Sequence, residues 1–119
     1  MKTENVIVEK SKAFAIRIIR LYQHLEIKHK GFPLSKQLLN SGTSIGANVN
    51  ESVFAQSTKD FVSKLKISLK ETNETGYWLE LLVATEYITD KEFQSINTDC
   101  IELKKILISI INSTDNNSK

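Results

Sequence analysis

The stretch HLEIKHKGFPLSKQLL, residues 24–39, holds the only proline of the chain, Pro33, and one of its four glycines, Gly31. Glycine commonly follows the last turn of a helix, and proline is tolerated in a first turn. The sequence KGFP therefore predicts that one helix ends near residue 29 and that another begins at residue 33.

Two capping signals divide the rest of the chain. Ser57 is followed three residues later by Asp60, and Thr89 by Glu92, which completes a capping box. A hydroxyl that accepts a hydrogen bond from a free N–H, with an acid in the first turn, is typical of a helix start. Together the signals predict four helices, over residues 5–29, 33–55, 58–88 and 90–112.

Apolar residues recur every three or four positions in each segment, as on the buried face of a helix. The first two stripes comprise Phe14, Ile18, Leu21, Tyr22 and Leu25, then Leu34, Leu38, Ile45, Val49 and Val53. The other two comprise Phe61, Leu65, Leu69, Thr72, Leu79 and Val83, then Phe93, Ile96, Cys100, Leu103, Leu107 and Ile110. Short connections make consecutive helices antiparallel, so the sequence predicts an all-α, up-down-up-down four-helix bundle.

The length and composition fit one domain. The chain has 119 residues, of which 40% are hydrophobic and 25% charged, close to the globular average. We expect a single domain over residues 1–119, with an ordered core at about 5–112. The tail from Asn112 to Lys119, NSTDNNSK, is expected to be flexible because it holds no apolar residue.

The chain shows no sign of secretion or of a membrane span. It has a single cysteine, Cys100, no leader pattern, and no apolar run near the ~20 residues of a membrane helix. We expect a cytoplasmic protein that does not cross a membrane.

The sequence offers no enzymatic site, and we expect no cofactor. Di-metal helix bundles use two Glu-x-x-His pairs and two further glutamates, whereas Glu26 and His29 form the only such pair here. Cys100 lies on a core stripe, which is typical of an inert buried thiol. Neither a glycine-rich phosphate loop nor a Ser/His/Asp set is present, so a non-enzymatic, metal-free protein is predicted.

The segment SGTSIGAN, residues 41–48, places Gly42 and Gly46 inside a helix, where each glycine costs about 1 kcal/mol relative to alanine. The two lie on one face and predict the close approach of a neighbouring helix, with Tyr77 or Trp78 as the expected contact. The other interpretation, a phosphate-cradling loop, would require a preceding strand.

Polar residues in the same region are expected to face inward. They are Asn48 and Glu51 on the second helix and Glu71 and Glu74 on the third. Buried carboxylates need partners, so we predict a hydrogen-bonded network that fixes helix register. The alternative is a pair of acids for general acid–base work.

Basic residues concentrate near the start of the chain, where residues 1–30 hold seven Lys/Arg against three Asp/Glu. They form one strip on the first helix and a second on the third. The strips comprise Lys10, Arg17, Arg20, His24 and Lys28, then Lys59, Lys66 and Lys70. Such strips are typical of phosphate binding, and a merely solvated face is the other interpretation.

Four isoleucines lie off the core stripes: Ile16 and Ile27 on the first helix, Ile101 and Ile108 on the fourth. If exposed, they would form apolar patches of a kind that monomers avoid. They predict self-association, which suits either a nucleic-acid-binding oligomer or a protein-interaction scaffold.

Two segments carry a family resemblance: FPLSKQLLNSGTSIGANVNES, residues 32–52, and DFVSKLKISLKETNETGYWLELL, residues 60–82. They resemble the four-helix-bundle proteins encoded in intervening sequences of bacterial 23S ribosomal RNA genes, over about residues 12–110. The chain departs from the family pattern at Asn50, where alanine is usual, and at Gly76, where arginine is common.

That family is similar to the accessory variability determinant of diversity-generating retroelements, a pentameric barrel of helix bundles that works with a reverse transcriptase and has affinity for nucleic acid. The resemblance implies a homo-oligomer, specifically a pentamer. It also implies RNA, or a nucleic-acid-processing protein, as a partner.

Overall fold

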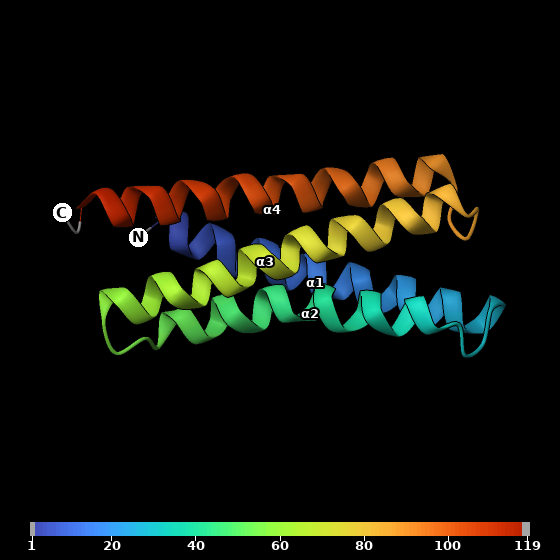
Figure 1. Ribbon diagram of the computed structural model, residues 1–119, viewed down its shortest axis with the longest axis horizontal. Coiled ribbons are helices and arrows are strands. Elements are labelled where there is room, and N and C mark those ends of the chain that lie inside the picture. Colours follow the sequence, from blue (N-terminus) through green and yellow to red (C-terminus); the bar gives the residue numbers. More distant parts are fainter. Residues whose placement is uncertain (1, 118–119) are drawn as a thin grey trace.

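The computed structural model describes residues 2–117. They form four helices, α1 (Lys2–Lys28), α2 (Pro33–Val53), α3 (Thr58–Ala84) and α4 (Asp90–Asn117), and this part of the chain contains no strand. In Figure 1 each helix runs back alongside the preceding one, in a molecule of 49 × 22 × 19 Å. The predicted all-α class is confirmed.

Four helix pairs pack side by side: α1 with α2, α2 with α3, α3 with α4, and α1 with α4. Across the two diagonals, α1 to α3 and α2 to α4, no Cα atoms of the described residues approach within 8 Å. These contacts are consistent with an up-down-up-down bundle. One consequence is that α1 and α3 expose their outer faces on different sides.

The predicted starts of α2, α3 and α4, at residues 33, 58 and 90, are confirmed. Gly31, in the connection between α1 and α2, adopts the left-handed conformation, with φ of 79°. Ser57 Oγ accepts from the Asp60 N–H over 3.0 Å. Thr89 and Glu92 form the reciprocal capping box, since Thr89 N–H donates to Glu92 Oε1 over 2.8 Å and Glu92 N–H to Thr89 Oγ1 over 3.1 Å. Local side-chain chemistry therefore fixes these starts.

α3 ends at Ala84, four residues before the expected boundary at 88. Glu86 adopts φ of 67°, and Tyr87 N–H donates to Leu82 O over 2.9 Å, which is the pattern of a Schellman helix end. Because a glutamate and not a glycine occupies the left-handed position, the sequence did not indicate this end. Ile88 is then free to pack into the core from the connection.

α4 continues to Asn117, five residues beyond the expected end at 112. The segment 112–117, expected to be flexible, is helical, and Ser118 and Lys119 lie outside the described residues. Ile111 is buried, Thr114 Oγ1 donates to Ile110 O over 2.8 Å, and Asp115 lies 3.9 Å from Lys66. These contacts with α3 and with the helix itself explain the extension.

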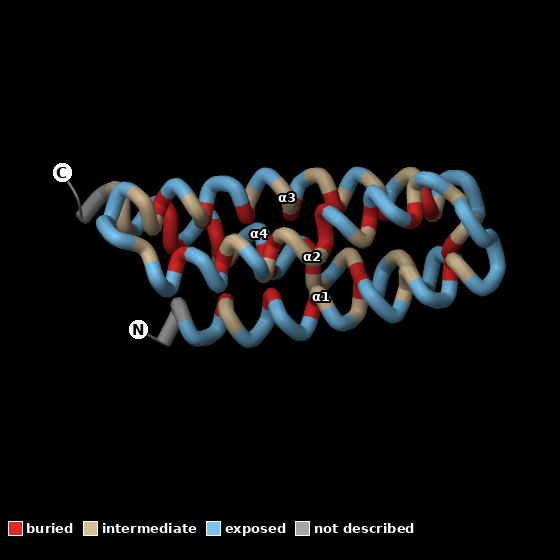
Figure 2. Tube along the Cα trace, turned by 90° about the horizontal axis from the view of Figure 1, so that it is seen from below, coloured by how far each residue is buried: buried red, intermediate tan, exposed pale blue. Residues whose placement is uncertain are grey.

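The core lies along the inner faces of all four helices, as the buried positions in Figure 2 show. On α4 the predicted stripe is confirmed from Ile96 to Ile110, with Phe93 only half-buried. Val53 was expected in the core of α2, but it is 55% exposed, and Ser52 is buried in its place. The Ser52 hydroxyl donates to Val49 O over 2.6 Å, so its burial leaves no polar group unpaired.

Hydroxyl groups, rather than carboxylates, make the polar contacts between α2 and α3. Ser68 Oγ donates to Ile45 O over 2.8 Å, and Thr75 Oγ1 donates to Ser41 Oγ over 2.9 Å. All three hydroxyl residues are buried. A neutral hydroxyl costs far less to bury than a carboxylate, so this network fixes register at low desolvation cost.

The predicted inward-facing network of Asn48, Glu51, Glu71 and Glu74 is not formed. Glu51 is exposed, and the Asn48 side chain donates within its own helix to Ser44 O over 2.9 Å. Glu71 and Glu74 are half-buried next to one another on the surface of α3. Burial, and then the neighbouring Glu74, raise the pKa of Glu71 above its ordinary value.

Candidate interaction surfaces

The two glycines of α2 face α1, not α3. A Cβ on Gly42 would lie 2.7 Å from Cγ1 and Cγ2 of Ile18, and one on Gly46 would lie 3.3 Å from the backbone oxygen of Ser11. The expected close approach is confirmed, but Tyr77 and Trp78 are not the contacts. The glycine pair sets how closely α1 and α2 pack.

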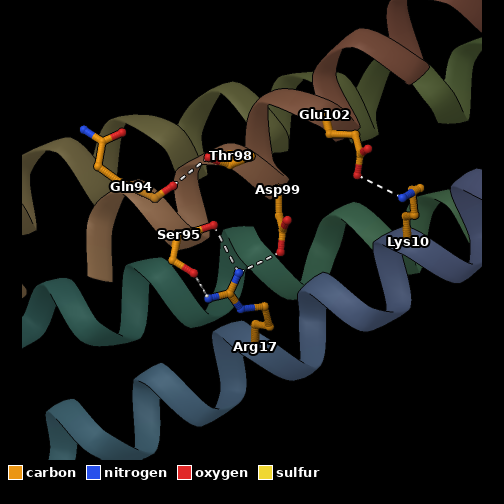
Figure 3. Close-up of polar contacts among 7 residues, drawn as sticks. All are labelled: Lys10, Arg17, Gln94, Ser95, Thr98, Asp99 and Glu102. Carbon is orange, nitrogen blue, oxygen red and sulfur yellow. Dashed lines mark hydrogen bonds and ion pairs between the residues drawn. The ribbon is translucent and has the colours of Figure 1, made fainter. Parts of the chain in front are cut away.

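Two members of the basic strip of α1, Lys10 and Arg17, reach toward α4, as Figure 3 shows. Lys10 Nζ lies 3.0 Å from Glu102 Oε1. Arg17 makes three contacts: Nη1 donates to Asp99 Oδ2 over 2.7 Å and to Ser95 O over 3.2 Å, and Nη2 donates to Ser95 Oγ over 2.9 Å. These interactions close the least extensive of the four helix interfaces.

Glu92, near the start of α4, extends the charged surface that α4 presents to α1. The Thr89 hydrogen bonds lower the pKa of Glu92, and the nearby charges of His24 and Lys28 lower it further. Two of the five strip residues, Lys10 and Arg17, therefore form ion pairs with α4, whereas Arg20, His24 and Lys28 are exposed and form none within the described chain. A sequence signal existed, because Glu92, Asp99 and Glu102 share one face of α4.

The lysines of α3 line an open groove of about 780 Å³ against the end of α4. We call it the basic groove; its lining comprises Thr58, Lys59, Val62, Ser63, Lys66, Ile67, Lys70 and Asp115. Lys66 lies 3.9 Å from Asp115, whereas Lys59 and Lys70 have no ion pair within the described residues. The structure thus brings Lys59, Lys66 and Lys70 together at one surface.

A second hollow, of about 320 Å³, lies farther along α3 and α4. We call it the Gly76 hollow; its lining comprises Thr72, Asn73, Gly76, Tyr77, Glu80, Asn97, Cys100, Ile101 and Lys104. Tyr77 is 55% exposed and Ile101 45% exposed at its rim. The sequence signal for this hollow was the glycine at 76, where the family pattern commonly has arginine.

All four off-stripe isoleucines are exposed, as expected: Ile16 by 43%, Ile27 by 84%, Ile101 by 45% and Ile108 by 37%. Ile19 adds a further exposed apolar side chain to α1. The role of these residues in assembly stays a prediction.

The single thiol and the Glu-x-x-His pair of the chain make structural contacts. Burial raises the pKa of the Cys100 thiol to about 11, and its Sγ donates to Thr72 O over 3.5 Å. Glu26 accepts from the Gly31 N–H over 3.4 Å, and His29 meets Tyr87 edge-on with ring centroids 4.7 Å apart. Among residues 2–117 no three His, Cys, Asp or Glu side chains cluster as a metal site would require.

No helix of the described chain combines the length and the apolar character needed to span a membrane.

Comparison with known proteins identifies relatives of this fold. The 23S rRNA-intervening sequence protein family matches residues 3–109. The crystal structure of a protein of unknown function from the S23 ribosomal protein family of Bacteroides thetaiotaomicron is 56% identical in sequence, with a TM-score of 0.90. The match covers 92% of this chain and 98% of that one. No curated protein matches the chain significantly.

Proposed function

The chain belongs to the 23S rRNA-intervening sequence protein family, and we propose that it is a non-enzymatic protein that forms a closed homo-oligomer, a pentamer, and binds RNA through a basic surface. The similarity of the family to the pentameric accessory variability determinant supports both parts of the proposal. So does the combination of exposed isoleucines and clustered lysines on one small bundle.

Self-association would bury apolar surface that the single chain leaves in water. The core is complete without Ile16, Ile27, Ile101 and Ile108, which are all exposed. Burying apolar area contributes about 25 cal/mol per Å², so two aliphatic patches brought together favour association. In a closed ring every copy would bury the same apolar surface.

The basic groove is the main structural support for the proposed RNA binding. It gathers Lys59, Lys66 and Lys70 around one acid, Asp115, at an open surface. The strip on α1 supports the proposal less strongly, because α4 carboxylates neutralise Lys10 and Arg17. Three lysines bind weakly alone, and repetition around a ring multiplies the positive field that attracts phosphates.

A gel-shift titration with single-stranded RNA at several salt concentrations tests this function. We expect binding that weakens with salt, because each neutralised phosphate contributes about −0.7 to the slope of log affinity against log salt. Lys66→Glu combined with Lys70→Glu should abolish binding, whereas Lys36→Glu with Lys105→Glu, the same charge change on other exposed positions, should not. Unchanged binding by the groove variant contradicts the assignment, and a wild type that binds no RNA favours a protein-interaction scaffold.

A further inference from the structure

We infer that the Gly76 hollow of one copy receives the exposed isoleucines of α1 from the next copy, so that the assembly is built from two different faces of the chain. The inference rests on the proposed homo-oligomer and names its contact surfaces. It follows from an unexplained glycine, from exposed apolar side chains on both faces, and from an exposed charge of opposite sign on each face.

Gly76 has no packing reason within the chain. A Cβ there would meet only Cys100 Sγ, at 3.8 Å, an ordinary van der Waals distance. Gly42 and Gly46 differ, since a Cβ on either would come within 3.3 Å of α1. A mid-helix glycine weakens a helix, so the space above Gly76 is explained if a partner's side chain fills it.

The rim of the Gly76 hollow combines exposed apolar side chains with polar ones. Tyr77 and Ile101 are exposed there, and Trp78 packs on Tyr77 with ring centroids 5.5 Å apart. The polar part of the rim comprises Asn73, Glu80, Asn97 and Lys104. An apolar cavity of about 150 Å³ holds a benzene-sized group, so a hollow of about 320 Å³ has room for branched aliphatic side chains.

The outer face of α1 offers a complementary surface. Ile16 and Ile27 are eleven residues apart, three helical turns, and therefore lie nearly in line, with Ile19 beside Ile16. Arg20 lies one turn beyond Ile16 on the same line, exposed and without an ion pair in the described chain. Its guanidinium complements the exposed carboxylate of Glu80 on the hollow's rim.

The two faces cannot meet within one chain. The hollow lies between α3 and α4, whereas α1 and α3 are diagonal in the bundle and make no contact. A contact between different faces is heterologous, and repetition of a heterologous contact closes a ring when the rotation allows. Two unlike apolar faces on one chain thus fit a cyclic assembly better than an isologous dimer.

Mixing two variants tests the inference. Ile16→Glu should disable the α1 face and Ile101→Glu the hollow, so each variant alone should scatter light as a monomer with unchanged helicity. An equimolar mixture, at a concentration where wild type is assembled, should form a heterodimer through the one intact hollow and the one intact α1 face. Mixed variants that stay monomeric, or single variants that still assemble, overturn the inference, while a monomeric wild type overturns the proposed oligomer itself.

A charge exchange provides a second measurement. Arg20→Glu and Glu80→Arg should each raise the assembly's dissociation constant at least several-fold, and the double variant should restore most of the loss. Failure of the double variant to restore assembly contradicts the pairing of Arg20 with Glu80. Lys36→Glu serves as the matched single-charge control.

Discussion

Arg17 Nη1 donates to Asp99 Oδ2 over 2.7 Å and so joins the first helix to the last. The same guanidinium also binds the backbone and side chain of Ser95. A planar guanidinium with several partners fixes both distance and register. A member of the strip that was predicted to bind phosphates thus has a role in closing the bundle.

Removal of this contact should loosen the α1–α4 interface. We expect Arg17→Ala to lower the free energy of unfolding by about 0.2–1 kcal/mol, the range for partly exposed ion pairs, with a smaller effect at high salt. Urea denaturation of the variant beside Lys36→Ala, an exposed lysine of α2, provides the measurement. Equal stability of the two variants would show that the Arg17 contacts contribute nothing.

The glycines of α2 should resist substitution, and Gly76 should tolerate it. Gly42→Ala places a methyl group 2.7 Å from the fully buried Ile18, and overpacking of this kind costs about 1–3 kcal/mol. Gly46→Leu should cost at least as much against the Ser11 backbone. Gly76→Ala, where the methyl fits, should raise folding stability by up to about 1 kcal/mol.

These three variants are best compared in the Ile16→Glu background by urea denaturation, so that assembly does not add to the folding free energy. A neutral Gly42→Ala would show that α1 moves aside at no cost. A destabilising Gly76→Ala would mean that the glycine serves folding and not a partner.

The sequence was sufficient for elements with local signals and insufficient for contacts between distant residues. Gly31, Ser57 and Thr89 marked helix boundaries because turn and capping chemistry is local. Glu86 gave no such mark, since a non-glycine residue adopts the left-handed conformation there. The end of α4 was also missed, because Lys66 and Asp115 meet only after folding.

For the candidate surfaces too, the sequence was sufficient within one helix and insufficient for contacts between helices. Periodicity placed Ile16 and Ile101 correctly outside the core of their own helices. It could not reveal that Arg17 meets Asp99, which lies 82 residues away, or that Gly42 faces Ile18. Single-helix patterns show which face is polar or apolar, but the neighbour of each face depends on how the helices pair.

Cys100 should make stability fall at alkaline pH. Its folded-state pKa is about 11, against an ordinary value of 9.0, so between those values the folded thiol keeps a proton that the unfolded chain loses. Unfolding then becomes more favourable as pH rises through this window. Denaturation of wild type and Cys100→Ala from pH 8 to 11 should show a steeper decline for the wild type, and parallel curves would contradict the burial of the thiol.

Neutralising Glu71 should stabilise the fold at neutral pH. Burial and Glu74 raise its folded-state pKa, so the charged form is disfavoured in the native state and stability is lost as pH rises through that shifted range. Glu71→Gln removes the penalty and should raise the urea midpoint at pH 7, with the advantage disappearing at low pH where Glu71 is protonated in both states. Glu51→Gln, on the exposed side of α2, is the control, and a lower midpoint for Glu71→Gln at pH 7 would contradict the expectation.

The mass of the wild-type protein in solution tests the central claim most directly, because ring assembly underlies both the shared apolar contacts and the repeated basic groove. Multi-angle light scattering should give five times the 13.5 kDa of the chain. Ile108→Glu should lower that mass while circular dichroism shows undiminished helicity. A wild-type mass of 13.5 kDa across the accessible concentration range would contradict the account.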